Sequence, residues 1–151
     1  MTEMIEAVDK NLLFNVGNVL VIPFWLAMIL LPRWAWILRI IRSPWIAAPP
    51  ALVYAVLVLP QVGGLLGALS NPSLASIAAL LGTQAGALIG WVHFLAFDLF
   101  VGRWAYLDAI ERKIHPLIMA PILFFTFMLG PLGLLLYLVV SRWLLAASRQ
   151  L

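Results

Sequence analysis

Apolar runs that contain almost no charge dominate this sequence and restrict what it can fold into. We predict four of them as membrane spans, at residues 12–31, 45–66, 82–101 and 116–138. Each is close to the ~20 residues that a helix needs to cross roughly 30 Å of hydrocarbon. Only structures that satisfy their own backbone hydrogen bonds can span lipid, and these runs lack the alternation of a barrel strand. We therefore predict an all-α, polytopic membrane protein with four transmembrane helices.

The composition excludes several classes of protein. Of the 151 residues, 65% are hydrophobic and 10% are charged, whereas a soluble domain carries about 25% charged residues. Cysteine is absent, which excludes disulfides and thiolate chemistry. The net charge is +3, but the basic residues flank the apolar runs, where membrane topology and anionic lipid account for them. We therefore expect membrane lipid as a partner and no nucleic acid.

Residues 61–81 join the second and third predicted spans and carry no charge. Pro60 is expected to end or kink the second span, and several glycines, Asn71 and Pro72 interrupt the apolar pattern after it. We predict a short interfacial helix over residues 74–81, near the membrane surface. A re-entrant segment and a continuous long third helix are the alternatives that the sequence leaves open. The whole chain, residues 1–151, is expected to form a single transmembrane domain.

Basic residues are distributed unevenly along the chain. Six lie between spans one and two or between spans three and four: Arg33, Arg39, Arg42, Arg103, Arg112 and Lys113. The opposite side holds three (Lys10, Arg142 and Arg149), together with an acidic opening that contains Glu3 and Glu6. The positive-inside rule then places both termini outside. The acidic opening matches neither a signal nor a transit peptide, so we expect a retained anchor and a location in a bacterial inner membrane.

Two ionisable residues, His93 and Asp98, lie inside the third predicted span. Ionisable groups in hydrocarbon are costly and face protein, a cavity or a partner charge, so this pair is the leading candidate for a functional site. On an ideal helix the two point about 140° apart, which argues against a direct bond between them. His93 shares a face with a series of small residues, Gly82, Gly86 and Gly90, which lets another helix approach closely.

Each of these residues also has a purely structural interpretation. For Asp98 it is a salt bridge to an arginine: Arg103, Arg33 or Arg39. For His93 it is one hydrogen bond to Asn15 or Asn18, which lie on one face of the first span. The functional alternative makes the two asparagines a hydrogen-bonding wall of a substrate pocket. Asp108 and Arg112, four residues apart, are predicted to form a helical ion pair.

Gly130-Pro131-Leu132-Gly133 interrupts the fourth predicted span. Pro131 removes one backbone hydrogen bond, so we predict a kink or a close-packing point, and irregular backbone of this kind often lines a cavity. Metal-binding and nucleotide-binding motifs are absent from the sequence. The two histidines are far apart in the chain, so we predict neither a metal site nor a cofactor.

The sequence WVHFLAFDLFVGRW at residues 91–104, with Asp108 after it, resembles the central signature of a known family of membrane proteins. This is the neoxanthin synthase-like family, which is also called the abscisic-acid-deficient-four-like family. Residues 130–137 (GPLGLLLY) resemble its last-helix motif. Residues 13–18 and 32–43 are similar more loosely. The sequence has no counterpart of the plastid transit region of plant members, so we expect a bacterial member.

The resemblance implies a four-helix membrane protein of carotenoid metabolism. Plant members are associated with turning violaxanthin into neoxanthin, an isomerisation that opens a ring epoxide to an allene without a redox cofactor. Such a reaction needs an acid at the epoxide oxygen and a base for a carbon-bound proton. Asp98 and His93 are the intramembrane candidates for these catalytic roles. The expected substrate-binding residues are Asn15, Asn18, Trp91, Arg103 and Pro131.

A second function from another class stays open. The chain can instead be a non-catalytic subunit that binds a carotenoid, an isoprenoid or a lipid and helps to assemble a membrane complex, either as a homo-oligomer or with other proteins. A small transporter is disfavoured because no span except the third carries a charge and no internal repeat is visible.

Overall fold

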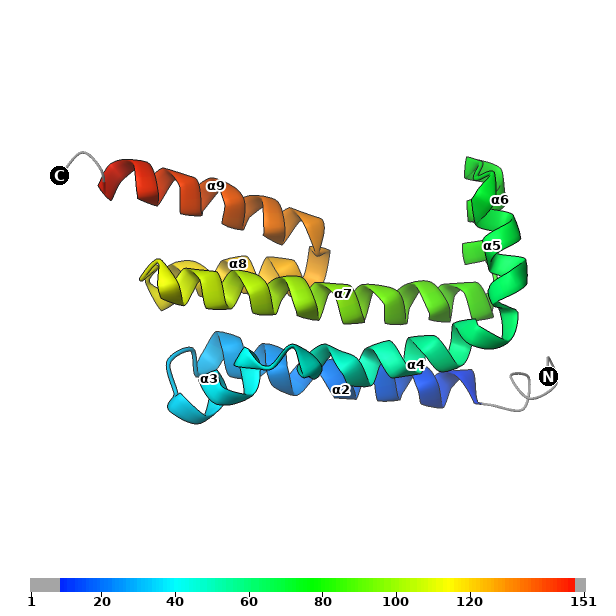
Figure 1. Ribbon diagram of the computed structural model, residues 1–151, viewed down its shortest axis with the longest axis horizontal. Coiled ribbons are helices and arrows are strands. Elements are labelled where there is room, and N and C mark those ends of the chain that lie inside the picture. The colour runs from blue at the N-terminus through cyan, green and yellow to red at the C-terminus, as the bar shows by residue number, and fades with distance from the viewer. Residues whose placement is uncertain (1–8, 149–151) are drawn as a thin grey trace. The chain divides into compact units, whose positions relative to one another are not determined.

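The computed structural model describes residues 9–148, and within them every regular element is helical. The elements, labelled in Figure 1, are α2 (Lys10–Leu30), α3 (Ala35–Arg42), η1 (Pro44–Ala47), α4 (Ala48–Val58), η2 (Leu59–Gln61), α5 (Val62–Ser70), α6 (Leu74–Leu81), α7 (Gln84–Glu111), α8 (Pro116–Leu129) and α9 (Pro131–Ser148). The all-α prediction is confirmed. The predicted orientation also counted the charges of Glu3, Glu6 and Arg149, which lie outside the described residues.

Within the described residues, three stretches are long and apolar enough to cross a membrane: Lys10–Leu30, Pro44–Ser70 and Gln84–Glu111. They correspond to the first three predicted spans. Only 6% of the most apolar window in Pro44–Ser70 is buried inside the protein, so its side chains are suited to hydrocarbon and not to water. The chain is therefore an integral membrane protein. Its orientation across the membrane stays a prediction.

The third helix is longer than predicted. We expected it to end at Val101, but α7 continues to Glu111. No proline lies between these residues, and a stretch of mixed apolar and charged side chains extends the helix past the apolar run. The chain leaves the helix through a turn at Lys113, whose φ of 57° is in the left-handed region that commonly follows a helix end.

The fourth predicted span is divided into two helices. α8 ends at Leu129 and is capped by Gly130, whose φ is +36° and whose N–H donates to the Thr126 carbonyl over 2.9 Å. Pro131 then opens α9, at a position where a missing N–H costs nothing, and the chain reverses direction between the two helices (Figure 1). The prediction of one helix over residues 116–138 is therefore wrong. α8 and the apolar part of α9 are shorter than the three candidate spans.

The segment between the second and third spans contains the short helix that we predicted there. Pro60 lies in the short 3₁₀ turn η2, where α4 gives way to α5. α6 has the predicted bounds and opens with a capping box, in which Ser73 and Ser76 exchange hydrogen bonds between side chain and backbone. Gly82 ends α6, so the alternative of one long third helix is wrong. The position of α6 at the membrane surface stays a prediction.

The chain forms two compact units. Among the described residues, the first unit consists of residues 9–21 together with Ala48–Ala96, and the second of Ile22–Ala47 together with residues 97–148. Leu57, Leu88 and Val92 make the core of the first unit. The second unit is built around fully buried side chains: Trp25, Met28, Ile41, Leu99, Tyr106, Leu123 and Tyr137. The single domain over residues 1–151 stays a prediction.

Candidate functional site

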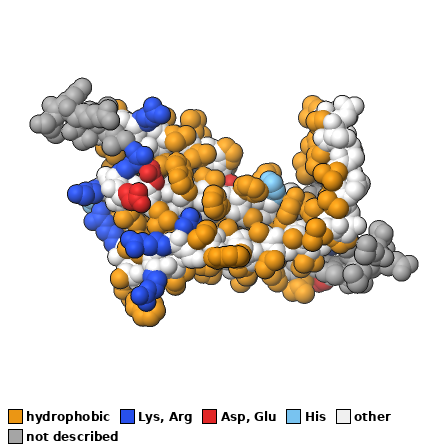
Figure 2. Space-filling model, in the orientation of Figure 1, with side chains coloured by type: hydrophobic (Ala, Val, Ile, Leu, Met, Phe, Trp, Pro, Cys, Tyr) orange, Lys and Arg blue, Asp and Glu red, His pale blue; other side chains and the backbone are white. Residues whose placement is uncertain are grey.

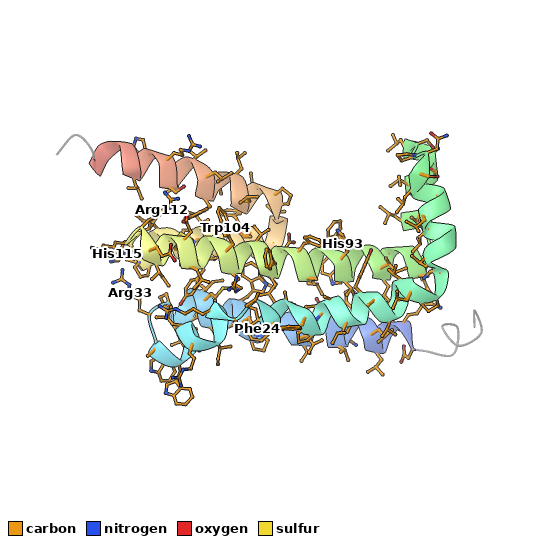
Figure 3. All side chains as sticks on the ribbon, in the orientation of Figure 1. Phe24, Arg33, His93, Trp104, Arg112 and His115 are labelled. Atoms are coloured by element: carbon orange, nitrogen blue, oxygen red, sulfur yellow. The ribbon has the colours of Figure 1, made fainter. Side chains whose placement is uncertain are left out.

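His93 lies on α7 in the first unit, where it is half-buried (Figure 3). Its imidazole lies against the ring of Tyr54 on α4, with centroids 5.4 Å apart and planes tilted by 57°. A hollow of about 110 Å³ adjoins this pair of rings, lined by Tyr54, Leu65, Leu80, Leu81, Gly86, Ile89, Gly90 and His93. Tyr54 and His93 are the polar side chains of that lining. The hollow therefore combines an apolar wall with two adjacent polar rings.

Glycines on α7 shape this hollow because they let the end of α6 come close. A Cβ on Gly86 would lie 1.9 Å from the carbonyl oxygen of Leu80, and one on Gly90 would lie 3.2 Å from a methyl group of Leu81. The predicted close approach at the small residues is thus confirmed, with the end of α6 as the neighbour. Gly82 is the exception, because it caps α6 and does not belong to α7.

Two predicted binding residues, Trp91 and Asn18, meet elsewhere in the same unit. The Trp91 indole N–H donates to the side-chain oxygen of Asn18 over 3.2 Å, and the Asn18 amide donates to the Phe14 carbonyl over 2.8 Å. The ring of Phe14 lies 5.7 Å from that of Trp91. Asn15 is exposed. The structure therefore joins Trp91 and Asn18 to each other, and these contacts link α2 to α7.

Asp98 belongs to the second unit, where its carboxyl lies against the reversal between α8 and α9. A Cβ on Gly130 would be 2.5 Å from Oδ1 of Asp98 and 3.0 Å from its Cγ. Pro131, which is a predicted binding residue, follows Gly130 directly. The turn therefore brings Pro131 near the Asp98 carboxyl. Between residues 9 and 148 the structure has one ion pair, and Asp98 is not part of it. The predicted salt bridge between Asp98 and an arginine is therefore wrong.

The Arg103 side chain forms hydrogen bonds with the backbone of α3. Its Nε donates to the carbonyl of Ile41 over 2.7 Å, and an Nη donates to the carbonyl of Arg42. The last carbonyls of a helix have no partner within the helix, and the fork of a guanidinium can satisfy two of them. Arg103 thus fastens the end of α3 to α7, which explains why it does not pair with Asp98. Its role in substrate binding stays a prediction.

Tyr106, one turn further along α7, fastens the end of α2. Its hydroxyl donates to the Pro32 carbonyl over 2.6 Å, and its side chain is buried. The sequence reasoning missed this residue. The available signal was its position three residues after Arg103, which places both side chains on one face of the helix.

A third polar contact links α7 to α9. The predicted ion pair is confirmed, since Nε of Arg112 lies 2.6 Å from Oδ2 of Asp108. Tyr137 of α9 donates its hydroxyl to the same carboxylate oxygen, and the ring of Trp104 packs edge-on against Tyr137 at 5.5 Å. The hydrogen bond to Asp108 raises the pKa of Arg112 above its ordinary value, so the guanidinium stays charged. Sequence reasoning missed the contribution of Tyr137.

Close packing completes this arrangement around α7. A Cβ on Gly102 would lie 2.2 Å from the indole of Trp25, which in turn packs against Phe127 with ring centroids 5.3 Å apart. Segment 98–108 of α7 therefore contacts α2, α3, the α8–α9 turn and α9 within the second unit. Two sequence motifs carry the family resemblance: residues 91–104 with Asp108, and residues 130–137. They meet here, where Gly130 lies against Asp98 and Tyr137 donates to Asp108.

Replacing Arg103 by leucine tests the fastening of α3. The two carbonyls would lose a charged donor, and hydrogen bonds to charged groups each contribute about 1.5–3 kcal/mol. We expect a loss of about 2 kcal/mol in the free energy of unfolding, measured by thermal unfolding of the purified protein in detergent. Arg142→Leu removes the same charge from an exposed position on α9 and should change little. Equal unfolding of the two variants would contradict this role of Arg103.

The family model described as ABA DEFICIENT 4-like matches residues 12–137. The chain belongs to the ABA DEFICIENT 4-like family. The match includes every predicted site residue and confirms the resemblance that residues 91–104, Asp108 and residues 130–137 suggested. The chain is also 28% identical over 108 residues to Protein ABA DEFICIENT 4, chloroplastic, of Arabidopsis thaliana. That alignment covers 68% of the chain and 49% of the plant protein, so the chain matches about half of its relative. No solved structure matches this chain.

Proposed function

We propose that this member of the ABA DEFICIENT 4-like family is a carotenoid isomerase of the membrane, and that the hollow beside His93 holds the reacting end group. This proposal rests on the contact between His93 and Tyr54 at the edge of an apolar hollow. Sites for small ligands are mostly apolar and contain a few polar groups that orient the ligand. The family resemblance supplies the substrate class, an epoxidised carotenoid ring.

The size of the hollow limits how much of such a substrate it could enclose. Its volume of about 110 Å³ is below the ~300–1,000 Å³ of a site that encloses a whole drug-sized ligand. One ring end group is therefore the part that would enter. The polyene chain would stay outside and lie along apolar side chains such as Phe94, which follows His93 and is 57% exposed.

The proposed reaction moves one proton and needs no oxidant or reductant. A base removes the proton from the chain carbon that neighbours the ring, and that electron pair forms the second double bond of the allene. The adjacent carbon–oxygen bond of the epoxide breaks, and an acid delivers a proton to the oxygen, which becomes a hydroxyl group. Substrate and product are therefore isomers. General acid–base catalysis of this kind contributes about 10²–10⁴ in rate.

Within this proposal His93 is the base. Its imidazole lies at the hollow, and one nitrogen of a neutral imidazole accepts a proton. Asp98 belongs to the second unit and does not line this hollow, so its catalytic role stays a prediction from its residue type and its position within the span. Tyr54 is a second candidate for the acid, because its phenol ring lies against His93 at the same hollow.

A non-catalytic role is the second candidate, and one observation favours it. Three polar residues of the family signature region, Arg103, Tyr106 and Asp108, make hydrogen bonds inside the protein. A subunit that binds a carotenoid and stabilises a complex needs such a frame and no reacting groups. This alternative predicts bound pigment without conversion.

The test is the pigment profile of a host that accumulates epoxidised carotenoids, with and without this protein. We expect a new carotenoid of unchanged mass that contains an allene, and its absence in cells that carry His93→Phe. An unchanged profile with carotenoid retained by the purified protein would favour the binding role. An unchanged profile with no retained pigment would contradict both functions.

A further inference from the structure

Helix α3 carries a hollow of its own in the second unit. Residues 35, 38, 39 and 42 share one face of this helix, with the spacing of a helical stripe. The hollow has a volume of about 540 Å³ and is lined by Ala35, Trp36, Leu38, Arg39 and Arg42. Apolar side chains and two guanidinium groups therefore meet in one concave surface.

The two arginines of this hollow are not used to hold the protein together. Basic residues in the last turn of a helix commonly satisfy its terminal carbonyls, but Arg103 already does so for α3. Both Arg39 and Arg42 are exposed. The ion pair Asp108–Arg112, alone of its kind in the described part of the chain, involves neither of them. Their charges are available to an anion from outside.

The surroundings of α3 are those of a membrane boundary. The helix follows directly after the span α2, and Ile41 is fully buried, which fixes the face that α3 turns outward. Three tryptophans around it, Trp34, Trp36 and Trp45, are 60%, 69% and 77% exposed. Exposed tryptophan side chains concentrate where the lipid headgroups meet the hydrocarbon.

Positive charge also gathers around this helix. Figure 2 shows lysine and arginine side chains grouped over the part of the second unit that contains α3 and the end of α7. Arg103 joins α3 to α7 through its hydrogen bonds to the carbonyls of Ile41 and Arg42. Lys113, just beyond the end of α7, adds to the positive charge there, whereas Arg112 is paired with Asp108. Clusters of basic residues beside a span attract anionic lipids.

We propose that α3 is a binding site for an anionic phospholipid. Arg39 and Arg42, three residues apart on one helix face, bind the lipid phosphate, for which the guanidinium fork is well suited. The glycerol and the first part of an acyl chain lie against Trp36 and Leu38. This site is independent of the His93 hollow, and it would exist whether or not the protein converts a carotenoid.

Native mass spectrometry of the full-length protein, with phosphatidylglycerol and phosphatidylcholine supplied at equal concentration, tests this site. We expect wild type to retain phosphatidylglycerol preferentially. The double variant R39Q/R42Q should lower that preference about tenfold, because each basic group near a membrane surface adds to the attraction. R39K/R42K keeps both charges without the guanidinium fork and should bind more weakly than wild type but better than R39Q/R42Q.

The matched control is R33Q/R142Q, which removes the same charge from exposed arginines outside the hollow and should keep the preference. Thermal unfolding in detergent checks that all variants are folded. An equal loss of preference in both glutamine variants would overturn the site in favour of diffuse charge. Equal retention of the two lipids by wild type would also overturn it, and so would loss of the preference in millimolar inorganic phosphate, which would indicate a site for the free ion.

Discussion

Replacing Gly133 by alanine is expected to lower the free energy of unfolding by about 3 kcal/mol, the upper part of the range for an overpacked site. The added methyl carbon would lie 2.1 Å from the backbone nitrogen of Thr126 and 2.3 Å from its Cα. Thr126 is fully buried in α8, and a helix backbone cannot move aside as the end of a flexible side chain can. The hairpin of α8 and α9 would have to separate locally. Thermal unfolding of the purified protein in detergent measures the loss.

Gly64→Ala is the matched control for this prediction. It adds the same methyl group to a helix, α5, but at a position with no other atom within 4 Å. Because alanine favours a helix over glycine by about 1 kcal/mol, this variant should be as stable as wild type or more stable. If Gly133→Ala unfolds at the same temperature as Gly64→Ala, the close packing of α8 against α9 is wrong.

Local sequence signals were sufficient to predict some elements and not others. α6 could be predicted with its bounds because Ser73 caps its start and Gly82 follows its end, and both effects are local. The reversal at Gly130 could not be distinguished from a kink, because proline and glycine have the same local effect in both cases. The contact of Gly133 with Thr126 across the hairpin decides between a reversal and a kink, and the sequence does not reveal this contact.

The candidate site was predictable to a similar extent. The glycine series of α7 correctly placed His93 on a face that another element approaches, because helical periodicity alone determines that face. The role of Arg103 was not predictable, since its partners at Ile41 and Arg42 are about sixty residues earlier in the chain. Tyr137 was missed for the same reason, because its acceptor lies on another helix.

His93→Phe is expected to lower the amount of the allenic product at least about 100-fold, which is the lower end of what a general base contributes. Phenylalanine keeps an aromatic ring against Tyr54 and fills the same space, but it cannot accept a proton. The variant should therefore fold and should still retain carotenoid after purification. Loss of the product together with retained pigment would separate the removal of a reacting group from the loss of binding.

His115→Asn is the control variant for this experiment. It removes the other histidine of the chain, which precedes α8 and accepts a hydrogen bond from the N–H of Leu117, and asparagine preserves a helix cap at that position. This variant should form as much product as wild type. The decisive measurement is the ratio of allenic product to epoxide substrate in pigment extracts, at equal levels of membrane protein. We predict a ratio near zero for His93→Phe and an unchanged ratio for His115→Asn, whereas a wild-type ratio for His93→Phe would contradict catalysis at the His93 hollow.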